Sequence, residues 1–390
     1  MNKTILVYRY NSICEPAVIR SLKALGHNVI EITEEMTNKQ ITPQQCINLL
    51  KEQLLSKKID AIFSINFFPV VSEVSKIFKV PYICIKVDCT ILELYSDSIK
   101  NEWNRIFMFD YTQYEEFAPK NPNCIFYLPL AADIEHYDQV VSTITEADNK
   151  FKSDISFVGS LYSEKSPYNK VKNLPAYQKG YLDGIIEAQL SIYGCNILPG
   201  LLTQEIVDEY KKYEAFYHFP EKSEHNEIAV LAHTVLGYRV AELERIRLLN
   251  ALAEHFIVDL YTGSDTAPLK NVNCKGLARS LTEMPKIFNL SKINLNFTVK
   301  PIQTGLPLRI WDIMGCGGFV LSNYQQEIPE YFEIGKEIEI FGSKDELIEK
   351  ANYYLTHEDE RAEIARNGYN KVKEMHTWKH RVETMLKVLE

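Results

Sequence analysis

Short hydrophobic runs alternate with amphipathic stretches along the first part of the chain. Such runs are typical of strands that are buried on both faces of a sheet. The predicted strands are Thr4–Tyr8, Asn28–Ile32, Ala61–Asn66, Tyr82–Val87, Arg105–Phe109 and Cys124–Leu128. Apolar residues at helical spacing predict helices between them, over Glu15–Leu25, Pro43–Leu55 and Val70–Phe78.

Buried strands separated by helices predict a parallel sheet with helices on both faces, which is a Rossmann-like arrangement. We expect this N-terminal α/β domain to occupy residues 1–150. The polar and charged segment Thr143–Ser153 predicts a linker to the next domain.

The second half resumes the same alternation after a long interruption. Residues 163–240 are polar, Tyr-rich and helix-like, and predict a helical insertion. Predicted strands are Asp154–Val158, Phe256–Tyr261, Ile293–Asn296 and Phe319–Ser322. Predicted helices are Val240–His255, Met284–Phe288, Pro307–Met314, Lys344–Leu355 and Glu358–Leu389. We therefore expect a second Rossmann-like domain over 151–360, and a C-terminal helix over 361–390 that crosses back to the first domain.

Composition narrows the function further. The 43 Lys and Arg against 52 Asp and Glu give a net charge of −9, which disfavours non-specific binding of nucleic acid. The eight cysteines include no C-x-x-C pair, which indicates reduced, buried thiols. The N-terminus lacks a signal-peptide pattern, and no apolar run is long enough to span a bilayer. We expect a cytoplasmic protein without an integral membrane segment.

The run Ser291–Asn323 holds the clearest candidate chemistry. A strand ends at Asn296, a polar loop runs through Thr298, Lys300 and Thr304, and Gly305 and Pro307 open a helix. Free amides at a helix start bind anions, and Lys300 and Arg309 add positive charge. Arg309 and Asp312 share one helix face. A diphosphate on Arg309 with ribose on Asp312 is one interpretation; a surface ion pair is the other.

This run resembles the C-terminal domain of GT-B glycosyltransferases, and within that group the CgeB-like branch of spore-maturation and flagellin-locus enzymes. In many GT-B enzymes an acid-x7-acid motif precedes a small-residue turn. Asp312 stands at the second acid and Thr304 at the first. The matching segments are Lys292–Asn296, Gly305–Phe319, Glu327–Phe332, Tyr353–Leu355, Glu360–Ala362 and Gly368.

The first half resembles the N-terminal domain of the same branch. The matching segments are Val87–Thr90, Leu94–Tyr95, Ile106–Asp110 and Tyr127–Asp133. The resemblance implies two domains that face each other across a cleft, with the acceptor mainly on the first. Asp88, at a strand end, is then a candidate general base; alternatively it caps a helix at Thr90–Tyr95. Glu15 is a second candidate base, or an ordinary first-turn acid.

Further donor-binding candidates follow the strands of the second domain. Gly159 and Ser160 could approach a phosphate or sugar closely, or form a plain turn. Thr262 follows another strand. Lys275, Gly276 and Met284 flank the nucleobase pocket by the resemblance, or belong to a surface loop.

The resemblance implies a glycosyltransferase, of hexosyltransferase type, that moves a sugar from a nucleotide-diphosphate donor to an acceptor hydroxyl. We expect a UDP-linked donor, no cofactor and no metal, since the metal-binding motif H-E-x-x-H and a strand-end D-x-D are absent from the sequence. The acceptor would be a protein Ser/Thr, as on flagellin or a spore-surface protein, or a glycan. The alternatives are a nucleotide-sugar epimerase or hydrolase of GT-B fold, and a catalytically silent nucleotide-sugar-binding or scaffold module.

Overall fold

The computed structural model describes residues 2–389, which form two compact units. Unit 1 contains residues 2–131, Phe219–His225 and 376–389, and unit 2 contains Ala132–His218 and Asn226–Met375. The division at Ala131 precedes the boundary that the sequence suggests near residue 150. The predicted linker Thr143–Ser153 is not a linker in the structure, because it contains the 3-10 helix η4 (Glu146–Phe151), which is part of unit 2. There the Asp148 carboxylate lies 3.0 Å from the Lys286 ammonium.

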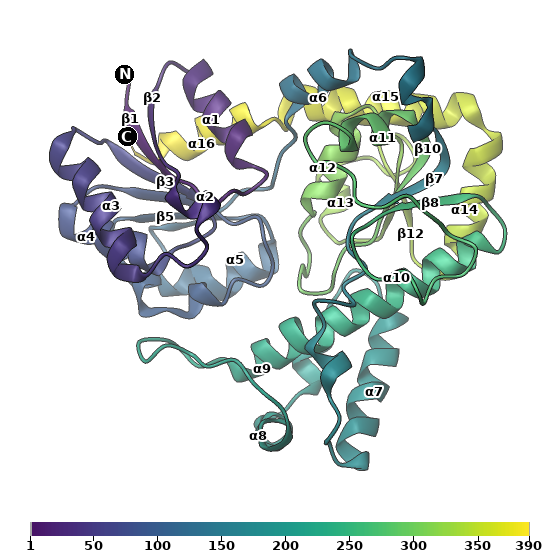
Figure 1. The fold of residues 1–390 in the computed structure, drawn as a ribbon, viewed down its shortest axis with the longest axis horizontal. Coiled ribbons are helices and arrows are strands. Elements are labelled where there is room, and N and C mark those ends of the chain that lie inside the picture. Colours follow the sequence, from purple (N-terminus) through teal and green to yellow (C-terminus); the bar gives the residue numbers. More distant parts are fainter. Residues whose placement is uncertain (1, 390) are drawn as a thin grey trace. The chain divides into compact units, whose positions relative to one another are not determined.

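Unit 1 is built on a six-stranded parallel sheet in the order β2-β1-β3-β4-β5-β6 (Figure 1). Its strands confirm the predicted ones to within a few residues. They are β1 (Thr4–Tyr8), β2 (Asn28–Ile32), β3 (Ala61–Ile65), β4 (Tyr82–Ile85), β5 (Asn104–Met108) and β6 (Ile125–Tyr127). β3 and β4 are buried along their whole length, as central strands of a covered parallel sheet must be.

The helices of unit 1 follow the predicted alternation. They are α1 (Glu15–Ala24), α2 (Glu34–Thr37), α3 (Pro43–Ser56), α4 (Pro69–Phe78), α5 (Tyr111–Phe117) and, from the C-terminal end, α16 (Trp378–Lys387). The short 3-10 helices are η1 (Leu92–Tyr95), η2 (Asp97–Lys100) and η3 (Ala118–Lys120). α16 packs against α1, so the chain's last helix belongs to its first unit.

Unit 1 also holds Phe219–His225, a segment from the region of the helical insertion. The Asp97 amide donates to the Lys222 carbonyl at 3.0 Å, and the Glu224 amide donates to the Tyr95 carbonyl at 2.8 Å. The Glu224 carboxylate also accepts from Lys120 at 2.6 Å. This segment is therefore hydrogen-bonded to the region of η1 and η2 through an isolated antiparallel bridge between Ser96 and Ser223, which its sequence does not predict.

Unit 2 contains a second six-stranded parallel sheet, in the order β12-β11-β10-β7-β8-β9. Its strands are β7 (Ser153–Val158), β8 (Val258–Tyr261), β9 (Asn273–Cys274), β10 (Ser291–Asn296), β11 (Val320–Asn323) and β12 (Glu339–Phe341). The edge strands β9 and β12 are the two that the sequence does not predict, because runs of two or three residues leave no periodic signal.

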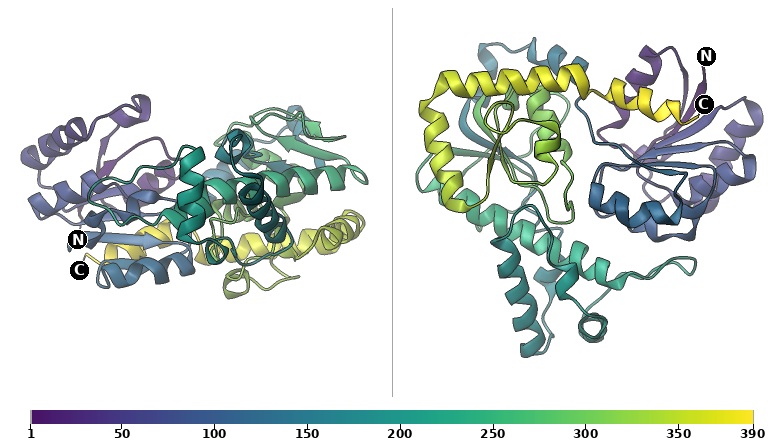
Figure 2. Two further views of the ribbon diagram at one scale, coloured as in Figure 1. Left: turned by 90° about the horizontal axis from the view of Figure 1, so that it is seen from below. Right: turned by 180° about the vertical axis from the view of Figure 1, so that it is seen from behind.

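Helices cover both faces of this sheet (Figures 1 and 2). The helices of unit 2 are α6 (Ile134–Val141), α7 (Ala176–Leu190), α8 (Gln204–Tyr213), α9 (Glu227–Ala229), α10 (Gly237–Ala253), α11 (Met284–Leu290), α12 (Leu308–Gly315), α13 (Ile328–Tyr331), α14 (Lys344–Thr356) and α15 (Glu358–Met375). Of these, α7, α8 and α9 belong to the insertion and project away from the sheet, and α7 and α8 pack with residues 230–240 in a hydrophobic cluster of their own. The insertion also contains the 3-10 helices η5 (Pro167–Lys170) and η6 (Pro199–Leu201), and a π-helix, η7 (Val230–Leu236), directly before α10.

β10 identifies which helices lie on which face. Ile293 and Leu295 belong to a buried cluster with residues of α10 and α14. Asn294 points the other way, because its amide donates to the Phe288 carbonyl of α11 at 3.0 Å. α10 and α14 therefore cover one face, and α11 and α12 the other, with α15 packed on α12 (Figure 2).

Two expectations need correction. The helix predicted over Glu358–Leu389 is two helices, because Thr377 and His380 form a capping box that starts α16. The thiols are free, but Cys195 and Cys274 are exposed and not buried, since they lie in a loop and an edge strand. Within residues 2–389, no helix has the length and apolar character needed to cross a bilayer.

Candidate functional site

The sheet of unit 2 reverses its strand order between β7 and β10. On one side of this point lie β8 and β9, and on the other β11 and β12. In open α/β sheets, ligands bind beyond the carboxyl ends of the strands where the order reverses. The residues after β7 and β10, Gly159–Ser160 and Phe297–Thr298, therefore mark the expected position of a ligand site.

Gly159, Ser160 and Thr262 lie together at this edge. The Gly159 amide donates to the Tyr261 carbonyl at 3.0 Å, which joins the turns after β7 and β8. Ser160 donates to the Glu164 carboxylate at 2.7 Å, and the Thr262 hydroxyl accepts from the Ser264 amide at 3.1 Å. The structure thus brings these three predicted residues together, with their side chains engaged in local turns.

Arg245, on α10, lies at the same edge and was not predicted. Its guanidinium donates to the Ser160 carbonyl at 2.5 Å and to the Phe297 carbonyl at 2.8 Å. It also lies over the rings of Phe157 and Tyr162, 5.3 and 4.7 Å from their centroids. Arg245 is 8% exposed and ties the ends of β7 and β10 together where the strand order reverses.

Asn296 and Thr298 form a buried polar network after β10. The Asn296 amide donates to Thr298 and to Ser322, both at 2.9 Å. The Thr298 amide donates to the Asn323 side chain at 2.7 Å. These buried hydrogen bonds fix the conformation of the loop between β10 and α12. Both predicted residues therefore stabilise the loop.

Arg309, Asp312 and Met284 meet on the α11–α12 face. Arg309 Nη1 lies 3.2 Å from the Asp312 carboxylate and 2.7 Å from Met284 Sδ, and the guanidinium lies 5.1 Å from the Phe288 ring centroid. The other Asp312 oxygen accepts from the Tyr137 hydroxyl of α6 at 2.6 Å. Arg309 keeps about a quarter of its side chain exposed, whereas Asp312 is buried.

Burial is the main influence on the acid of this cluster. It raises the pKa of Asp312 above its usual value, against the opposing effects of Arg309 and of the Tyr137 hydrogen bond. Burial, and then the Asp312 carboxylate, also raise the pKa of Tyr137, which keeps this hydroxyl protonated as the donor. The Arg309–Asp312 pair is thus a partly buried network and not the surface ion pair that the sequence left open.

Lys300 lies apart from Arg309. Its ammonium is buried 3.1 Å from the Glu244 carboxylate of α10 and 4.6 Å from the Tyr193 ring centroid. This places it toward the α10–α14 face, whereas Arg309 is on α12. The structure therefore does not bring the two predicted cations together.

The remaining predicted residues of unit 2 have separate surroundings. The Thr304 hydroxyl donates to Glu327 at 2.7 Å, so an acid from the following segment faces the position where the motif's first acid would stand. The Gly305 carbonyl accepts from Gln325 at 3.1 Å. Lys275 lies 3.5 Å from Asp259, and Gly276 is exposed with a φ of +78° that favours glycine.

In unit 1, Asp88 lies after β4 beside residues that follow β1 and β3. The Asn66 amide donates to the Asp88 carboxylate at 2.6 Å and to the Tyr10 hydroxyl at 2.7 Å. The Asn66 side-chain oxygen accepts from the amides of Val87 and Asp88, at 2.9 and 3.3 Å. Asp88 is exposed. Burial, and then the Asp88 charge, raise the pKa of Tyr10.

The structure excludes one of the two interpretations of Asp88, the helix cap. The next helical turn, η1, begins at Leu92 and has Ile91 at its N-cap, so Asp88 caps no helix. Instead, an exposed carboxylate is held at the carboxyl edge of the sheet by Asn66.

Glu15 has the opposite character. It is buried at the start of α1, where its carboxylate accepts from the Tyr10 amide at 2.8 Å and from Arg9 Nε at 3.1 Å. Both oxygens are therefore engaged with the chain itself. The geometry matches the first-turn acid of the sequence analysis.

His376 and His380, four positions apart near the C-terminus, both have structural partners. His376 Nδ1 is 2.7 Å from Arg381, and His380 Nδ1 is 2.7 Å from the Thr377 hydroxyl. Among residues 2–389, no group of three or more His, Cys, Asp or Glu side chains is arranged to hold a metal ion.

Comparison with known proteins links this geometry to a fold. A family model described as "Glycosyl transferase-like" matches residues 245–387, which run from Arg245 in α10 through α16 and include Arg309 and Asp312. No curated protein matches the chain at a significant level.

Similar solved structures cover the chain from end to end. Anabaena HepE, in complex with UDP-glucose, is 12% identical with a TM-score of 0.54, over 100% of this chain and 99% of that one. A UDP-forming α,α-trehalose-phosphate synthase from Burkholderia xenovorans is 11% identical, with a TM-score of 0.54 over 100% and 99%. Sucrose-phosphate synthase from Thermosynechococcus elongatus is 8% identical, with a TM-score of 0.56 over 99% and 98%.

The chain has the GT-B fold. The predicted fold class, two Rossmann-like domains with a helical insertion and a helical tail, is thereby confirmed. The glycosyltransferase superfamily is supported by the family match together with these GT-B neighbours. Assignment to the CgeB-like branch stays a prediction.

Sequence analysis missed Arg245 as a residue of this site. On α10 it stands between Glu244 and Arg247, and this cluster of charged residues is typical of a solvent-exposed helix face. One signal could have found it. Leu248 and Leu249 lie three and four positions after Arg245, so they share its helix face, and both are buried in the core of the sheet.

Proposed function

We propose that this protein is a nucleotide-sugar-dependent glycosyltransferase. The observation that supports the proposal most strongly is the family match over residues 245–387. Most of it falls on the unit whose sheet reverses at β7 and β10, where ligands of open α/β sheets bind.

In this proposal unit 2 binds the donor. Arg309 contacts the diphosphate with its exposed edge, beside the amides that open α12. Asp312 accepts hydrogen bonds from ribose, which requires Tyr137 or Arg309 to release one carboxylate oxygen. Gly159, Ser160 and Thr262 line the sugar and phosphate side, and Met284, Lys275 and Gly276 the nucleobase side.

The charges present suit a leaving diphosphate. Arg245 and Arg309 are guanidinium groups on the two helices that border the reversal point, α10 and α12. Fixed donors and cations aimed at developing negative charge stabilise a transition state without reorganisation. Metal-independent transfer is therefore part of the proposal.

Unit 1 supplies the acceptor side. In the transfer step, the acceptor hydroxyl oxygen forms a bond to the anomeric carbon while the bond from that carbon to the diphosphate oxygen breaks. The hydroxyl proton passes to a base. Asp88 is the better candidate because it is exposed and held by Asn66, whereas Glu15 is buried and fully hydrogen-bonded.

A UDP-linked hexose is the proposed donor, since HepE is solved with UDP-glucose and the trehalose-phosphate synthase is UDP-forming. The proposed acceptor is a protein Ser/Thr, as on flagellin or a spore-surface protein, or a glycan, in line with the CgeB-like resemblance. A cytoplasmic location stays a prediction of the sequence. The position of Thr304 keeps one alternative in view, a silent nucleotide-sugar-binding module.

The test is a panel of UDP-glucose, UDP-N-acetylglucosamine and GDP-mannose, followed by thermal shift and by nucleotide release with and without acceptor protein. We expect one donor to raise the Tm and to release nucleotide only when acceptor is present. Release without acceptor identifies the epimerase or hydrolase alternative, and binding without release identifies the silent module. No shift with any donor refutes the proposal.

Variants connect the result to the site. Arg309→Gln should weaken donor binding at least tenfold, because a charge-assisted contact to phosphate is lost. Arg279→Gln is the matched control, since Arg279 is 80% exposed and paired with Glu283 on the same unit. Asp88→Asn should abolish transfer while leaving donor binding intact.

A further inference from the structure

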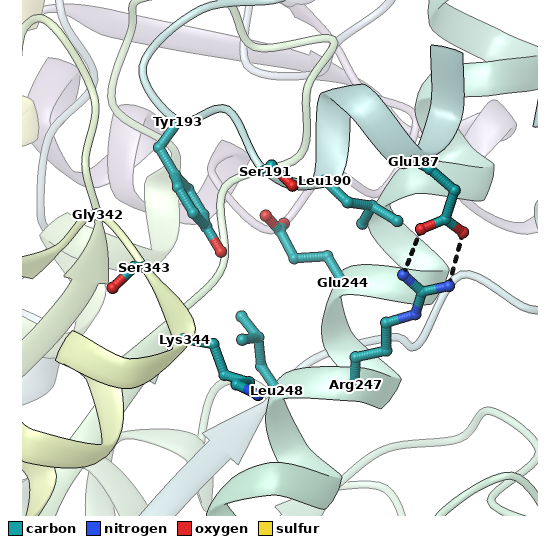
Figure 3. A pocket seen from close by; sticks show the side chains of 10 residues that line it. All are labelled: Glu187, Leu190, Ser191, Tyr193, Glu244, Arg247, Leu248, Gly342, Ser343 and Lys344. Carbon is teal, nitrogen blue, oxygen red and sulfur yellow. Dashed lines mark hydrogen bonds and ion pairs between the residues drawn. The ribbon is translucent and has the colours of Figure 1, made fainter. Parts of the chain in front are cut away.

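A cavity of about 330 Å³ lies on the α10–α14 face of unit 2 (Figure 3). Its lining comes from α7 and the loop after it, from α10, and from the segment that starts α14. Arg309 and Asp312 lie on the opposite face of the sheet, with α11 and α12. The lining of the cavity contains none of the donor residues proposed above, and no role is yet assigned to it.

The charged side chains around the cavity neutralise one another. Glu187 and Arg247 form a two-bond ion pair, with both N–O distances 2.7 Å. Glu244 is 3.1 Å from the buried ammonium of Lys300. Lys344, at the rim, lies 3.9 Å from Asp345. A ligand with a full charge would therefore meet no unpaired counter-ion.

Several polar groups nevertheless face the cavity without a protein partner. The side chain of Glu244 is 2% exposed, and one of its oxygens takes the Lys300 bond while the other has no hydrogen bond among residues 2–389. Within the same described range, neither the Tyr193 nor the Ser191 hydroxyl bonds to another protein group. Figure 3 shows the Tyr193 hydroxyl and the Glu244 carboxylate directed into the same space.

The apolar part of the lining is small. Leu190 of α7 and Leu248 of α10 contribute it, next to the Tyr193 ring. A volume near the lower end for ligand pockets, about 300 Å³, fits a compact ligand rather than an extended one such as a nucleotide sugar.

We propose that this cavity binds one neutral sugar residue. A sugar ring offers hydroxyl donors to the free Glu244 oxygen, acceptors and donors to Tyr193 and Ser191, and C–H surface to the two leucines. It carries no charge, which agrees with the internally paired ions. The two sources of such a residue are a free monosaccharide and a residue within a glycan chain. This inference does not depend on the proposed transfer activity.

Saturation-transfer NMR tests the proposal on the full-length protein. The probes are glucose, galactose and N-acetylglucosamine, each as the free sugar and as its methyl glycoside, in the presence of saturating UDP. We expect transfer to at least one sugar with UDP present. A methyl glycoside that binds at least as well as the free sugar indicates a residue within a glycan, and the reverse preference indicates a monosaccharide.

Variants locate the signal. Ser191→Trp fills the exposed mouth of the cavity and should abolish the transfer. Tyr193→Phe keeps the ring over Lys300 and should weaken binding about fivefold through the loss of one hydrogen bond. Their matched controls, Ser142→Trp and Tyr177→Phe, change exposed residues outside the cavity and should bind normally. Circular dichroism verifies that each variant is folded.

Three results would overturn the proposal. One is the absence of transfer to every sugar with the wild-type protein. Another is a signal that persists in Ser191→Trp or disappears when UDP is added, which places the sugar elsewhere. The third is inorganic phosphate that displaces the sugar both from the wild-type protein and from the two control variants, because a neutral site has no reason to prefer an anion.

Discussion

At the scale of single residues, Arg245 and Arg247 lie two positions apart on α10 and differ in what they bind. Arg245 is buried and donates to the Ser160 and Phe297 carbonyls, whereas Arg247 is half-exposed and paired with Glu187. Arg245→Met should lower the free energy of unfolding by about 2–4 kcal/mol, since two carbonyls lose a charged donor. Arg247→Met should cost less than about 1 kcal/mol. Urea unfolding measures both, and equal losses would contradict a structural role for Arg245 at the strand ends.

A second prediction at this scale concerns Asp312 and pH. Burial raises its pKa in the folded protein, so between the unfolded value, about 3.9, and the folded value the native state holds more protons than the unfolded chain. Stability contributed by this group therefore falls as pH rises through that window. Asp312→Asn removes the penalty, so its Tm relative to wild type should rise from pH 4 to pH 7.

Thermal scans at one-unit pH steps check this expectation. Asp345→Asn removes one negative charge from an exposed position, 92% exposed at the side chain, and is the matched control for net charge. A Tm difference for Asp312→Asn that stays constant over this pH range, or follows the control, would show that burial does not govern this carboxyl.

Individual site residues were only partly predictable from sequence. The helical spacing of Arg309 and Asp312 predicted that they share one helix face, and their side chains lie 3.2 Å apart there. The spacing carried no information on Tyr137, which is 175 positions away and supplies the third member of the network. Lys300 shows the same limit, because its partner Glu244 belongs to a different helix. Contacts between distant elements leave no local pattern in a single sequence.

At the scale of elements, α15 depends on a glycine where it meets the rest of unit 2. A Cβ on Gly368 would lie 2.4 Å from the Glu337 carbonyl oxygen and 2.7 Å from Met314 Cε. Because the nearest atom is backbone, α15 or the Glu337 segment would have to move. We expect Gly368→Ala to destabilise the protein by about 1–3 kcal/mol, as over-packed sites do.

Gly184, which lies in the helix α7, is the matched control for the substitution of Gly368 in α15. A Cβ there would meet nothing within 4 Å, and alanine favours helix over glycine by about 1 kcal/mol. Gly184→Ala should therefore raise the midpoint of urea unfolding while Gly368→Ala lowers it. Equal shifts of the same sign would mean that helix propensity, and not the contact with Glu337, dominates at Gly368.

The elements themselves were the most predictable level. Buried runs such as Ala61–Ile65, and amphipathic helices such as Pro43–Ser56, have periodicities that only one secondary structure satisfies. The misses have physical causes. β12 is three residues long, and the break before α16 depends on one capping box within an otherwise helical pattern.

At the scale of the whole molecule, the two units give donor binding a testable location. If UDP binds at the reversal point of unit 2, it stabilises that unit by RT ln(1 + [L]/Kd), about 2.7 kcal/mol at a hundredfold excess over Kd. Some amides exchange through local opening of a short segment, without unfolding of the whole protein. For these amides, UDP should slow exchange only in segments that contact it or lie next to such a contact.

Hydrogen exchange with and without UDP therefore tests the location directly. We expect slower exchange in the turn after β7 and between β10 and α12, including the amides of Leu161 and Arg309. The segments around Asn66 and Asp88 in unit 1 serve as the internal control and should change less. The Arg309→Gln variant should lose most of the protection in unit 2. Protection confined to unit 1, or spread equally over both units, would move the nucleotide away from the β7–β10 edge and with it the proposed division of donor and acceptor.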